Sequence, residues 1–339
     1  MFNLESYNSF ALKVYANDGL IVNSLSDLEQ ARTKIVQDKH AYIVLGEGTD
    51  VLFKESFNGV AIINRLKGKS VTEDSSFYYV SAMAGENLDS FIKWCLDSNI
   101  YGLENLAKIP GTVGGAPIQN AGAYGVSVSD FCHQIKVYNF ETGEYDVLDN
   151  SQCFFGYRTS IFKQDSSFRK YVIVEVTFKL KKEWKPLFLY ESLKWMEVSQ
   201  KNVSAIDVYN YISKLRSEKL PNPKILGNAG SFFKNPYISI TKFQELKEEF
   251  ENVPYYELTD KSVKVAAGWL IDKAGFKGYV QGNVSVYDKQ AVIIVNNGGA
   301  EPNEIVELAH FVMNKVQERF GISIQHEVVV YDKNGESSL

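Results

Sequence analysis

Residues Gly102–Gly125 read GLENLAKIPGTVGGAPIQNAGAYG, and this segment constrains the chain more than any other. It holds six glycines and two prolines. A glycine has no Cβ, so its main-chain N–H can approach a ligand closely, and successive N–H groups in such turns form concavities that hold phosphates. The glycines lack the spacing of the Gly-x-Gly-x-x-Gly turn that binds nicotinamide dinucleotides. The segment therefore indicates either a phosphate-binding loop of another architecture or a loop whose glycines serve packing alone.

The bulk properties of the chain narrow the class of protein. A length of 339 residues allows two or three domains, and a net charge of −5 gives no electrostatic reason to expect nucleic acid or an anionic membrane as a partner. The three cysteines lack C-x-x-C spacing, which favours a reducing compartment and argues against a disulfide or zinc framework. The sequence shows no signal peptide and no apolar run long enough to span a bilayer. We therefore expect a cytoplasmic protein without a metal site.

Hydrophobic periodicity predicts an α+β organisation. Strands are expected at 41–45, 77–82, 134–138, 171–180, 291–296 and 327–331, and helices at about 88–96, 204–217 and 303–320. The last two helices carry inward apolar stripes, at Val208, Tyr211, Ile212 and Leu215 and at Ile305, Leu308, Val312 and Val316. Gly321 is expected to end the final helix. We interpret Lys181–Ser204 as a connector or covering loop and expect the polar tail Lys333–Leu339 to be frayed.

A second, shorter glycine turn follows the strand at 41–45. It reads GEGTDVLF and covers Gly46–Phe53. Its main-chain amides can bind a phosphate, or the segment is an ordinary turn between a strand and a loop, since short glycine motifs often match by chance.

Three single residues stand in segments that can carry chemistry, and each has a plainer alternative. Arg158, in FGYRTSIFK, is either a surface residue at a strand edge or a guanidinium directed at a carboxylate. Ser231, in LGNAGSFFKNP, is a nucleophile, a proton donor or a turn residue, and acyl transfer fits poorly because the pattern Gly-x-Ser-x-Gly is absent. Glu327 opens the last predicted strand, where a carboxylate is usually solvated. The four histidines show no metal-ligand spacing.

Taken together, these segments closely resemble one family. GEGTDVLF, GLENLAKIPGTVGGAPIQNAGAYG, FGYRTSIFK, GNAGSFFKNP, KVAAGWLIDKAGFKG and the terminal strand from Glu327 occur in one order, as in UDP-N-acetylenolpyruvoylglucosamine reductase, the FAD enzyme family of bacterial peptidoglycan precursor synthesis. The likeness runs from about Ser9 to about Tyr331, and the insert around Tyr190 is similar to the longer-chained form of the family.

The resemblance implies a fold and a division into parts. The expected fold is α+β, with a two-part FAD-binding domain of the vanillyl-alcohol-oxidase/PCMH type and a C-terminal α+β substrate domain. The implied parts are FAD-binding subdomain 1 (1–70), FAD-binding subdomain 2 with a covering loop (71–200), a substrate-binding domain (201–325) and a terminal strand with a frayed tail (326–339).

The resemblance also implies a reaction. NADPH reduces FAD, and hydride then passes to C3 of the enolpyruvyl group of UDP-N-acetylglucosamine enolpyruvate, which gives UDP-N-acetylmuramate. Negative charge develops on C2 and the carboxylate of the substrate, and donors preset toward such charge are usually the largest catalytic contribution. By their matching motifs, Arg158 would hold the substrate carboxylate, Ser231 would donate the proton to C2, and Glu327 would assist at the carboxylate.

Contacts to cofactor and substrate follow from the same resemblance. Both glycine loops would hold FAD, and without a covalent link, because neither contains histidine or cysteine. The implied FAD-binding residues are Gly46, Gly48, Thr49, Asp50, Pro110, Gly111, Gly114, Gly115, Asn120 and Gly122. The implied substrate contacts are Tyr157, Tyr190, Lys219, Asn235 and Gln290. Asp50 stands where the family usually has asparagine, which places an acceptor-only anion near a diphosphate.

Two rival functions share part of this pattern. A related FAD oxidase or dehydrogenase acting on an alcohol or hydroxy acid would keep the first domain without needing Arg158, Ser231 and Glu327 together. A catalytically silent flavin- or nucleotide-binding protein would need none of the three, and only an activity measurement separates it from an enzyme.

Overall fold

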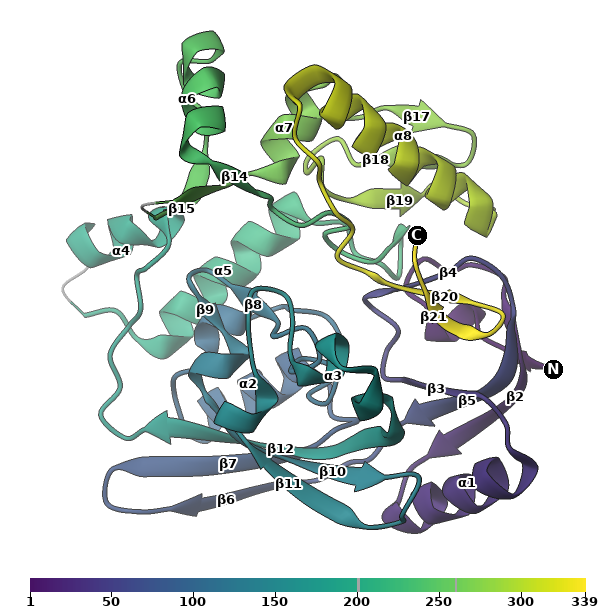
Figure 1. Cartoon of the computed structure of the whole chain (residues 1–339). Coiled ribbons are helices and arrows are strands. Elements are labelled where there is room, and N and C mark those ends of the chain that lie inside the picture. The colour runs from purple at the N-terminus through teal and green to yellow at the C-terminus, as the bar shows by residue number, and fades with distance from the viewer. Residues whose placement is uncertain (200–201, 260) are drawn as a thin grey trace. The chain divides into compact units, whose positions relative to one another are not determined.

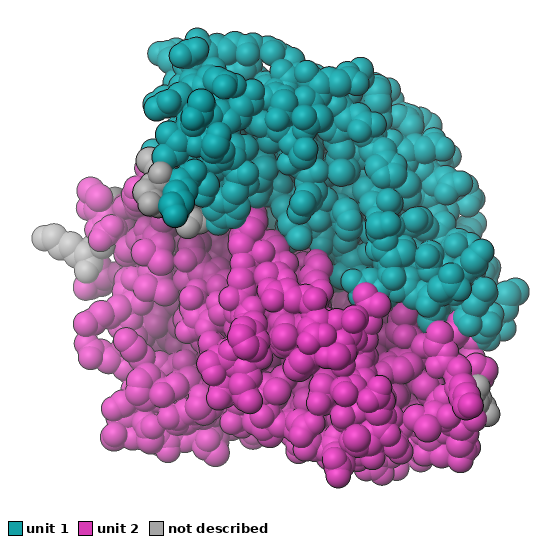
Figure 2. All heavy atoms as spheres, in the orientation of Figure 1, with its two compact units in different colours: residues 1–17, 48–58, 219–339 teal, residues 18–47, 59–218 magenta. Residues whose placement is uncertain are grey.

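The chain folds into two compact units, each assembled from segments that are separate in the sequence. The computed structural model describes residues 1–199, 202–259 and 261–339. Unit 1 comprises residues 1–17, 48–58 and 219–339, and unit 2 comprises residues 18–47 and 59–218 (Figure 2). The first glycine loop is therefore divided, with Gly46 in unit 2 and Gly48 in unit 1. The four functional parts expected from the sequence divide the chain differently from these two compact units. Their boundary at 200/201 lies outside the described residues.

The largest sheet of unit 2 is antiparallel, with the strand order β11-β10-β12-β7-β6 (Figure 1). Its strands are β6 (Lys69–Glu73), β7 (Phe77–Met83), β10 (Cys132–Asn139), β11 (Tyr145–Asp149) and β12 (Tyr171–Lys181). The helix α2 (Leu88–Asp97) packs its buried apolar face into the same core, where the rings of Phe91 and Phe178 lie 5.4 Å apart. The strands and the helix predicted for these segments are confirmed.

Unit 2 also contains most of the chain before residue 65. Its elements there are β2 (Tyr15–Val22), α1 (Leu25–Asp38), β3 (Tyr42–Leu45) and β5 (Phe57–Asn64), with β2 and β5 beginning in unit 1. Ser24 and Asp27 start α1 with a reciprocal capping box. β3 and β5 pair in parallel, so both faces of these strands are largely apolar. Among these elements the sequence predicts only β3, which delivers the chain directly to Gly46.

Unit 2 also contains short elements and a longer helix. The short elements are β8 (Gly122–Ala123), β9 (Val126–Ser127), α3 (Ile161–Gln164) and α4 (Lys194–Ser199). The longer helix is α5 (Ala205–Lys219), whose last residue is assigned to unit 1. The helix α4 lies within the stretch interpreted as a connector, so that interpretation is wrong for these residues. The helix α5 is confirmed, together with its Ser204–Asp207 capping box.

The inward face of α5 differs from the predicted stripe. The fully buried residues are Ala205, Val208, Tyr209 and Ile212, whereas Tyr211 and Leu215 are half-buried. The Tyr209 hydroxyl donates to the Asp89 carboxylate at 3.0 Å, which lets this tyrosine enter the core. The buried face of α5 therefore includes Tyr209 because Asp89, on α2, accepts its hydroxyl group. The hydrophobic periodicity of α5 cannot predict a partner on another helix.

Unit 1 is built on a four-stranded antiparallel sheet with the order β13-β19-β18-β17. Its strands are β13 (Gly227–Asn228), β17 (Val280–Gln281), β18 (Val284–Val286) and β19 (Ile294–Asn296), the last being shorter than predicted. The helix α8 (Pro302–Phe320) packs on β18 and β19, and its predicted stripe is fully buried. Gly321 ends α8 in the left-handed conformation, with φ 66°, as the sequence predicts.

A smaller antiparallel sheet stands beside two helices within unit 1. Its strands are β14 (Tyr237–Ser239), β15 (Tyr255–Leu258) and β16 (Ser262–Val265), and the helices are α6 (Ile240–Glu249) and α7 (Ala267–Lys273). The short strand β1 (Phe2–Asn3) pairs with the start of β2. No helix in the described part of the chain is long and apolar enough to cross a membrane.

The carboxyl terminus is an ordered hairpin. It consists of β20 (Val329–Asp332) and β21 (Gly335–Ser337), and β20 also pairs in parallel with β4 (Val51–Phe53). The Asp332 carboxylate accepts the Asn334 N–H at 2.7 Å, and Gly335 takes a positive φ of 129° to close the turn. The expected frayed tail is therefore wrong, because these polar residues pair with a strand that is itself held by β4.

Candidate active site

Arg158 is held in a strained two-residue turn of unit 2. Gly156 and Thr159 form an isolated antiparallel bridge, which leaves Tyr157 and Arg158 at the turn. Arg158 has a φ of 54°, a left-handed conformation that non-glycine residues seldom adopt. Its Nη2 donates to the carbonyl oxygen of Gly122 at 2.9 Å, and its guanidinium carbon lies 5.6 Å from the centre of the Tyr157 ring. A guanidinium carries five N–H donors, so this bond is compatible with carboxylate binding as well.

The glycine-rich segment supplies further bonds to the same turn. The Asn120 Nδ2 donates to the carbonyl oxygen of Gly156 at 3.1 Å and to the Ser129 hydroxyl at 3.2 Å. The Ser160 hydroxyl donates to the carbonyl oxygen of Ile118 at 2.5 Å. Asn120 and Ser160 are both buried. Asn120, which the sequence places among the FAD-binding residues, therefore contacts the turn that carries Arg158.

The two glycine loops meet inside unit 2. A Cβ added to Gly46 would lie 2.5 Å from the Thr112 hydroxyl oxygen, so only glycine allows this approach. The Asn87 Nδ2 donates to the Glu47 carboxylate at 3.0 Å and to the carbonyl oxygen of Gly111 at 3.3 Å. The start of the first loop and the middle of the second, at Gly111 and Thr112, are therefore side by side, as a single ligand cradle requires.

The residues around this junction fit a bound flavin nucleotide. A Cβ on Gly114 would lie 2.5 Å from that of Ala84, while Gly115 and Pro110 are exposed at the rim. The Gln119 Oε1 is buried and accepts no hydrogen bond from the described part of the chain. A buried acceptor without a donor costs about 1–3 kcal/mol, which a ligand bearing N–H or O–H groups relieves. Flavin and ribose carry such donors, so Gln119 is a candidate that the sequence reading missed.

The remainder of the first loop belongs to unit 1. Gly48 has a φ of 64°, and a Cβ there would overlap the carbonyl oxygen of Tyr7. The carbonyl oxygen of Asp50 accepts the Val329 N–H at 2.9 Å, which starts the β4–β20 pairing. Thr49 lies between them and is half-buried. Gly48 is thus required by close packing against the N-terminal segment, whatever ligand the loop also holds.

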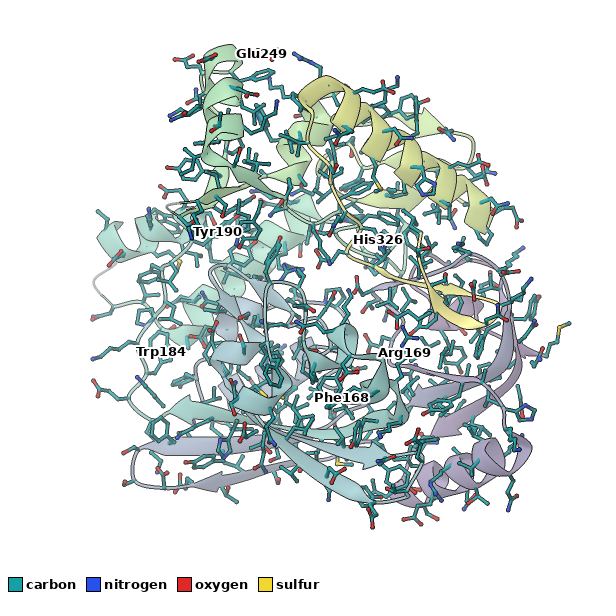
Figure 3. All side chains as sticks on the ribbon, viewed as in Figure 1. Phe168, Arg169, Trp184, Tyr190, Glu249 and His326 are labelled. Carbon is teal, nitrogen blue, oxygen red and sulfur yellow. The ribbon has the colours of Figure 1, made fainter. Side chains whose placement is uncertain are left out.

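Ser231 and Glu327 are neighbours in unit 1, although the sequence separates them widely. The carbonyl oxygen of Phe232 accepts the Glu327 N–H at 2.7 Å, and the Phe232 N–H donates to Val292 at 2.7 Å. Phe233 and His326 form the adjoining antiparallel bridge (His326 is labelled in Figure 3). Ser231 is exposed, whereas Glu327 is buried.

Two predicted substrate residues meet at the start of α7. The Asn235 Oδ1 accepts the Ala267 N–H at 2.9 Å and so caps the first turn of this helix. A Cβ on Gly268 would lie 2.9 Å from the Gln290 Oε1, which places the Gln290 side chain against the same turn. The structure therefore brings Asn235 and Gln290 together through α7.

Tyr190 lies in a cluster of unit 2 that contains two residues not singled out from the sequence. Tyr190, which is labelled in Figure 3, lies in the segment before α4. Its ring is 5.3 Å from the ring of Tyr124. The Arg216 Nε donates to the carbonyl oxygen of Lys108 at 3.3 Å. Burial lowers the pKa of the Arg216 guanidinium, an effect opposed by Tyr124 and reinforced by the positive charge of Arg158. The cluster thus combines two guanidinium groups with aromatic rings, a setting suited to an anionic, ring-bearing ligand.

Lys219 is the last residue of α5 and is exposed, one helical turn beyond Arg216. No local sequence pattern marks Arg216, since it stands among alternating charged and polar residues of an ordinary helix. The predicted set is therefore divided: Ser231, Glu327, Asn235, Gln290 and Lys219 belong to unit 1, and Arg158, Tyr157 and Tyr190 belong to unit 2.

Comparison with known proteins matches two parts of the chain to families. Residues 20–148 match the FAD binding domain family, and residues 222–331 match the C-terminal domain of UDP-N-acetylenolpyruvoylglucosamine reductase. A solved UDP-N-acetylenolpyruvylglucosamine reductase from Thermus caldophilus covers 97% of this chain and 97% of its own, with a TM-score of 0.66 and 22% identity, which supports the fold alone. The predicted α+β fold class, with FAD-binding and C-terminal domains, is confirmed.

Curated relatives match almost the whole chain. The UDP-N-acetylenolpyruvoylglucosamine reductase of Pasteurella multocida is 42% identical over 336 residues, covering 99% of this chain and 98% of its own. The enzyme of the same name from Shewanella oneidensis is 42% identical over 338 residues, covering 100% and 98%. The resemblance found in the motifs is thereby confirmed at full length, and the chain belongs to the UDP-N-acetylenolpyruvoylglucosamine reductase family.

Proposed function

We propose that this chain is an oxidoreductase that uses NADPH and FAD to reduce the enolpyruvyl group of UDP-N-acetylglucosamine enolpyruvate. The product is UDP-N-acetylmuramate, a precursor of peptidoglycan and hence of the cell wall. The observation that carries the proposal is the full-length likeness to the Pasteurella multocida reductase, at 42% identity. The family match of residues 20–148 to FAD binding domains supports the cofactor.

FAD, when bound, supplies the redox chemistry that links NADPH to the CH–CH bond of the substrate. We assign its diphosphate to the two glycine loops, which meet through Gly46 and Thr112 in unit 2. The proposed contacts are Gly46, Gly48, Thr49, Asp50, Pro110, Gly111, Gly114, Gly115, Asn120 and Gly122, with Gln119 as an addition. The binding is non-covalent, because neither loop contains histidine or cysteine.

The roles of the chain's own residues follow from where charge develops on the substrate. Reduction at C3 leaves negative charge on C2 and on the carboxylate. Arg158 binds the carboxylate and stabilises this charge, and Glu327 assists at the same group. Ser231 donates a proton to C2. A serine hydroxyl is a weak acid that suits a strongly basic carbanion, and the exposure of Ser231 lets solvent restore its proton.

We assign the nucleotide sugar to the residues that the family motifs imply. The proposed contacts are Tyr157, Tyr190, Lys219, Asn235 and Gln290, with Arg216 and Tyr124 added by their place beside Arg158 and Tyr190. Lys219 is the proposed partner of the diphosphate. We further infer a cytoplasmic location, because the three cysteines are free thiols, as a reducing compartment keeps them.

A reconstitution experiment tests the proposal. The FAD-loaded protein is expected to be yellow, to lose its colour when NADPH is added without oxygen, and to regain it when UDP-N-acetylglucosamine enolpyruvate follows. Bleaching by NADPH without recovery on substrate would favour an oxidase-type enzyme of the same flavoprotein fold. Absence of colour after reconstitution with FAD would favour a catalytically silent protein. Formation of UDP-N-acetylmuramate, detected by mass spectrometry, identifies the product independently.

A further inference from the structure

Three hydrogen bonds join alternate residues of the glycine-rich segment to the turn that carries Arg158. The carbonyl oxygen of Ile118 accepts from the Ser160 hydroxyl at 2.5 Å, and that of Gly122 accepts from Arg158 Nη2 at 2.9 Å. Between them, Asn120 donates through Nδ2 to the carbonyl oxygen of Gly156 at 3.1 Å. The stretch 118–122 therefore contacts the turn at its beginning, its middle and its end.

These bonds are shielded from water. Asn120 is 6% exposed and Ser160 is 0% exposed. The orientation of the Asn120 amide is set by a second bond, because its Oδ1 accepts the Ser129 N–H at 2.9 Å. The nitrogen must then face Gly156, since a backbone N–H can donate only to the amide oxygen.

The turn needs such support because its conformation is strained. Arg158 has a φ of 54°, and Asn120 itself has a φ of 49°. Left-handed residues other than glycine cost about 1–3 kcal/mol and persist only where the surroundings over-determine them. Here the main chain of Arg158 is held through Gly156 and Ser160, and the end of its side chain is held through Gly122. Residues 118–122 therefore hold both the main chain and the guanidinium group of Arg158.

We propose that Asn120 and Ser160 are positioning residues for Arg158, and that residues 118–122 serve as the template for this catalytic guanidinium. The inference rests on the proposed function of Arg158 as the group that binds the substrate carboxylate. It gives the glycine-rich segment a second task beside holding FAD. A misplacement of about 1 Å at a group that orients substrate can slow a reaction about 10²-fold, so loss of the template should slow the chemistry of the substrate specifically.

The test uses the FAD-loaded enzyme and separates its two half-reactions by anaerobic stopped flow. Ser160→Ala removes the hydroxyl bond, and Asn120→Asp exchanges the donor that faces Gly156 for an acceptor. Ser160→Ala is expected to keep the FAD dissociation constant, the flavin absorption spectrum and the rate of flavin reduction by NADPH. Asn120 is itself a proposed FAD contact, so Asn120→Asp is compared with the wild type only in its reoxidation rate, at saturating FAD. Reoxidation by UDP-N-acetylglucosamine enolpyruvate should slow by about 10-fold to 10²-fold. If either variant binds FAD more weakly and reoxidises at the wild-type rate, the residues serve the flavin and the inference is overturned.

Matched controls exist in the same unit. Asn64 is 6% exposed, donates to the carbonyl oxygen of Ile173 at 3.0 Å and accepts the Leu66 N–H at 3.2 Å, so Asn64→Asp repeats the chemistry of Asn120→Asp. Thr177→Val removes a buried hydroxyl that bonds Ser81 at 2.8 Å. Both controls should lose stability in thermal unfolding and keep the reoxidation rate. If reoxidation slowed equally in the control variants, general destabilisation would explain the slowing in Ser160→Ala and Asn120→Asp, and the inference would be overturned.

A double-mutant cycle completes the test. If Ser160 acts through Arg158, Ser160→Ala should slow reoxidation in the wild-type background and add nothing in an Arg158→Lys background. Equal effects in both backgrounds would contradict a positioning role while leaving the function of Arg158 intact. If Arg158→Lys by itself leaves reoxidation unchanged, the proposed function of Arg158 fails, and the positioning inference falls with it. If Asn120→Asp does not fold, the Ser160→Ala measurements alone test whether this segment positions Arg158.

Discussion

The main-chain N–H of Glu327 donates to the carbonyl oxygen of Phe232 at 2.7 Å. This bond fixes a buried carboxylate beside the exposed turn that carries Ser231, and the neighbouring bridge between Phe233 and His326 fixes the register of the two segments. The proposed proton donor and the proposed carboxylate partner are therefore placed by backbone pairing. Such placement survives substitution of either side chain, which makes each role separately testable.

Ser231→Ala should leave flavin reduction by NADPH unchanged and slow reoxidation by the enolpyruvyl substrate. The proton that Ser231 supplies to C2 would be missing, and general acid catalysis of this kind contributes roughly 10²–10⁴-fold. Anaerobic stopped-flow measurement of the two half-reactions gives both rates. Ser231→Thr, which keeps a hydroxyl group, is the control and should retain part of the reoxidation rate. Unchanged reoxidation in the alanine variant would show that another group donates the proton.

Asn235 is predicted to have two separable roles. Asn235→Asp keeps an oxygen that accepts the Ala267 N–H, so α7 stays capped, but the side chain loses its amide donors for the substrate. The Michaelis constant for substrate should rise while the melting temperature stays close to that of the wild type. Asn235→Ala should also lose about 1 kcal/mol of unfolding free energy, because the cap is gone. A substrate Michaelis constant that remains at the wild-type value in both variants would assign Asn235 to structure only.

Asp50→Asn should bind FAD at least as tightly as the wild type. An aspartate near the flavin diphosphate opposes an anion, whereas asparagine offers donors, and the backbone bond from Val329 to residue 50 does not depend on the side chain. Titration of the apoprotein with FAD at low and moderate salt measures the dissociation constant. The advantage of asparagine should shrink as salt screens the repulsion. A clearly weaker affinity in the variant would mean that the Asp50 carboxylate makes a favourable contact.

Glu104 should make stability decrease with rising pH. Burial raises the pKa of this carboxyl above its ordinary value of 4.5, although the Trp184 Nε1 at 2.6 Å and the Gly102 N–H at 2.7 Å favour the charged form. A raised folded-state pKa contributes stability that is fully present below 4.5 and is lost as pH rises through the folded-state value.

Glu104→Gln removes this titration. Urea unfolding of both proteins is measured from below pH 4.5 upward. As pH increases, the unfolding free energy of Glu104→Gln should rise relative to that of the wild type. The difference between the two proteins isolates Glu104 from other carboxylates that titrate in the same range. A difference that is constant with pH would contradict the raised pKa.

Gly48→Ala should destabilise the protein far more than a comparable change at Gly299. Both glycines have positive φ, 64° and 74°, so alanine costs about 1–2 kcal/mol at each from the backbone alone. At Gly48 the new Cβ also overlaps the carbonyl oxygen of Tyr7, whereas at Gly299 no atom lies within 4 Å. Urea unfolding measures both losses. Equal losses at the two positions would show that the segment around Tyr7 moves aside without cost.

Elements with a strong local pattern were predictable. The stripe Ile305, Leu308, Val312 and Val316 is fully buried on α8, and Gly321 ends the helix as expected. Elements that depend on a partner far away in the sequence were not predictable. The tail at 333–339 is polar, so nothing local predicts that it pairs with β20. In the same way, the buried face of α5 depends on Asp89, which belongs to another helix and accepts the Tyr209 hydroxyl.

The sequence by itself determined the class of cofactor and the family of the reaction, because glycine loops and long motifs are local and survive in one order along the chain. Only the tertiary structure decided which of these residues lie together. It placed Glu327 beside Ser231 through Phe232, and it gave Asn120 a bond to the turn of Arg158. The physical reason is that hydrogen bonds between distant segments depend on how strands and turns pair in space, and a one-dimensional pattern does not record that pairing.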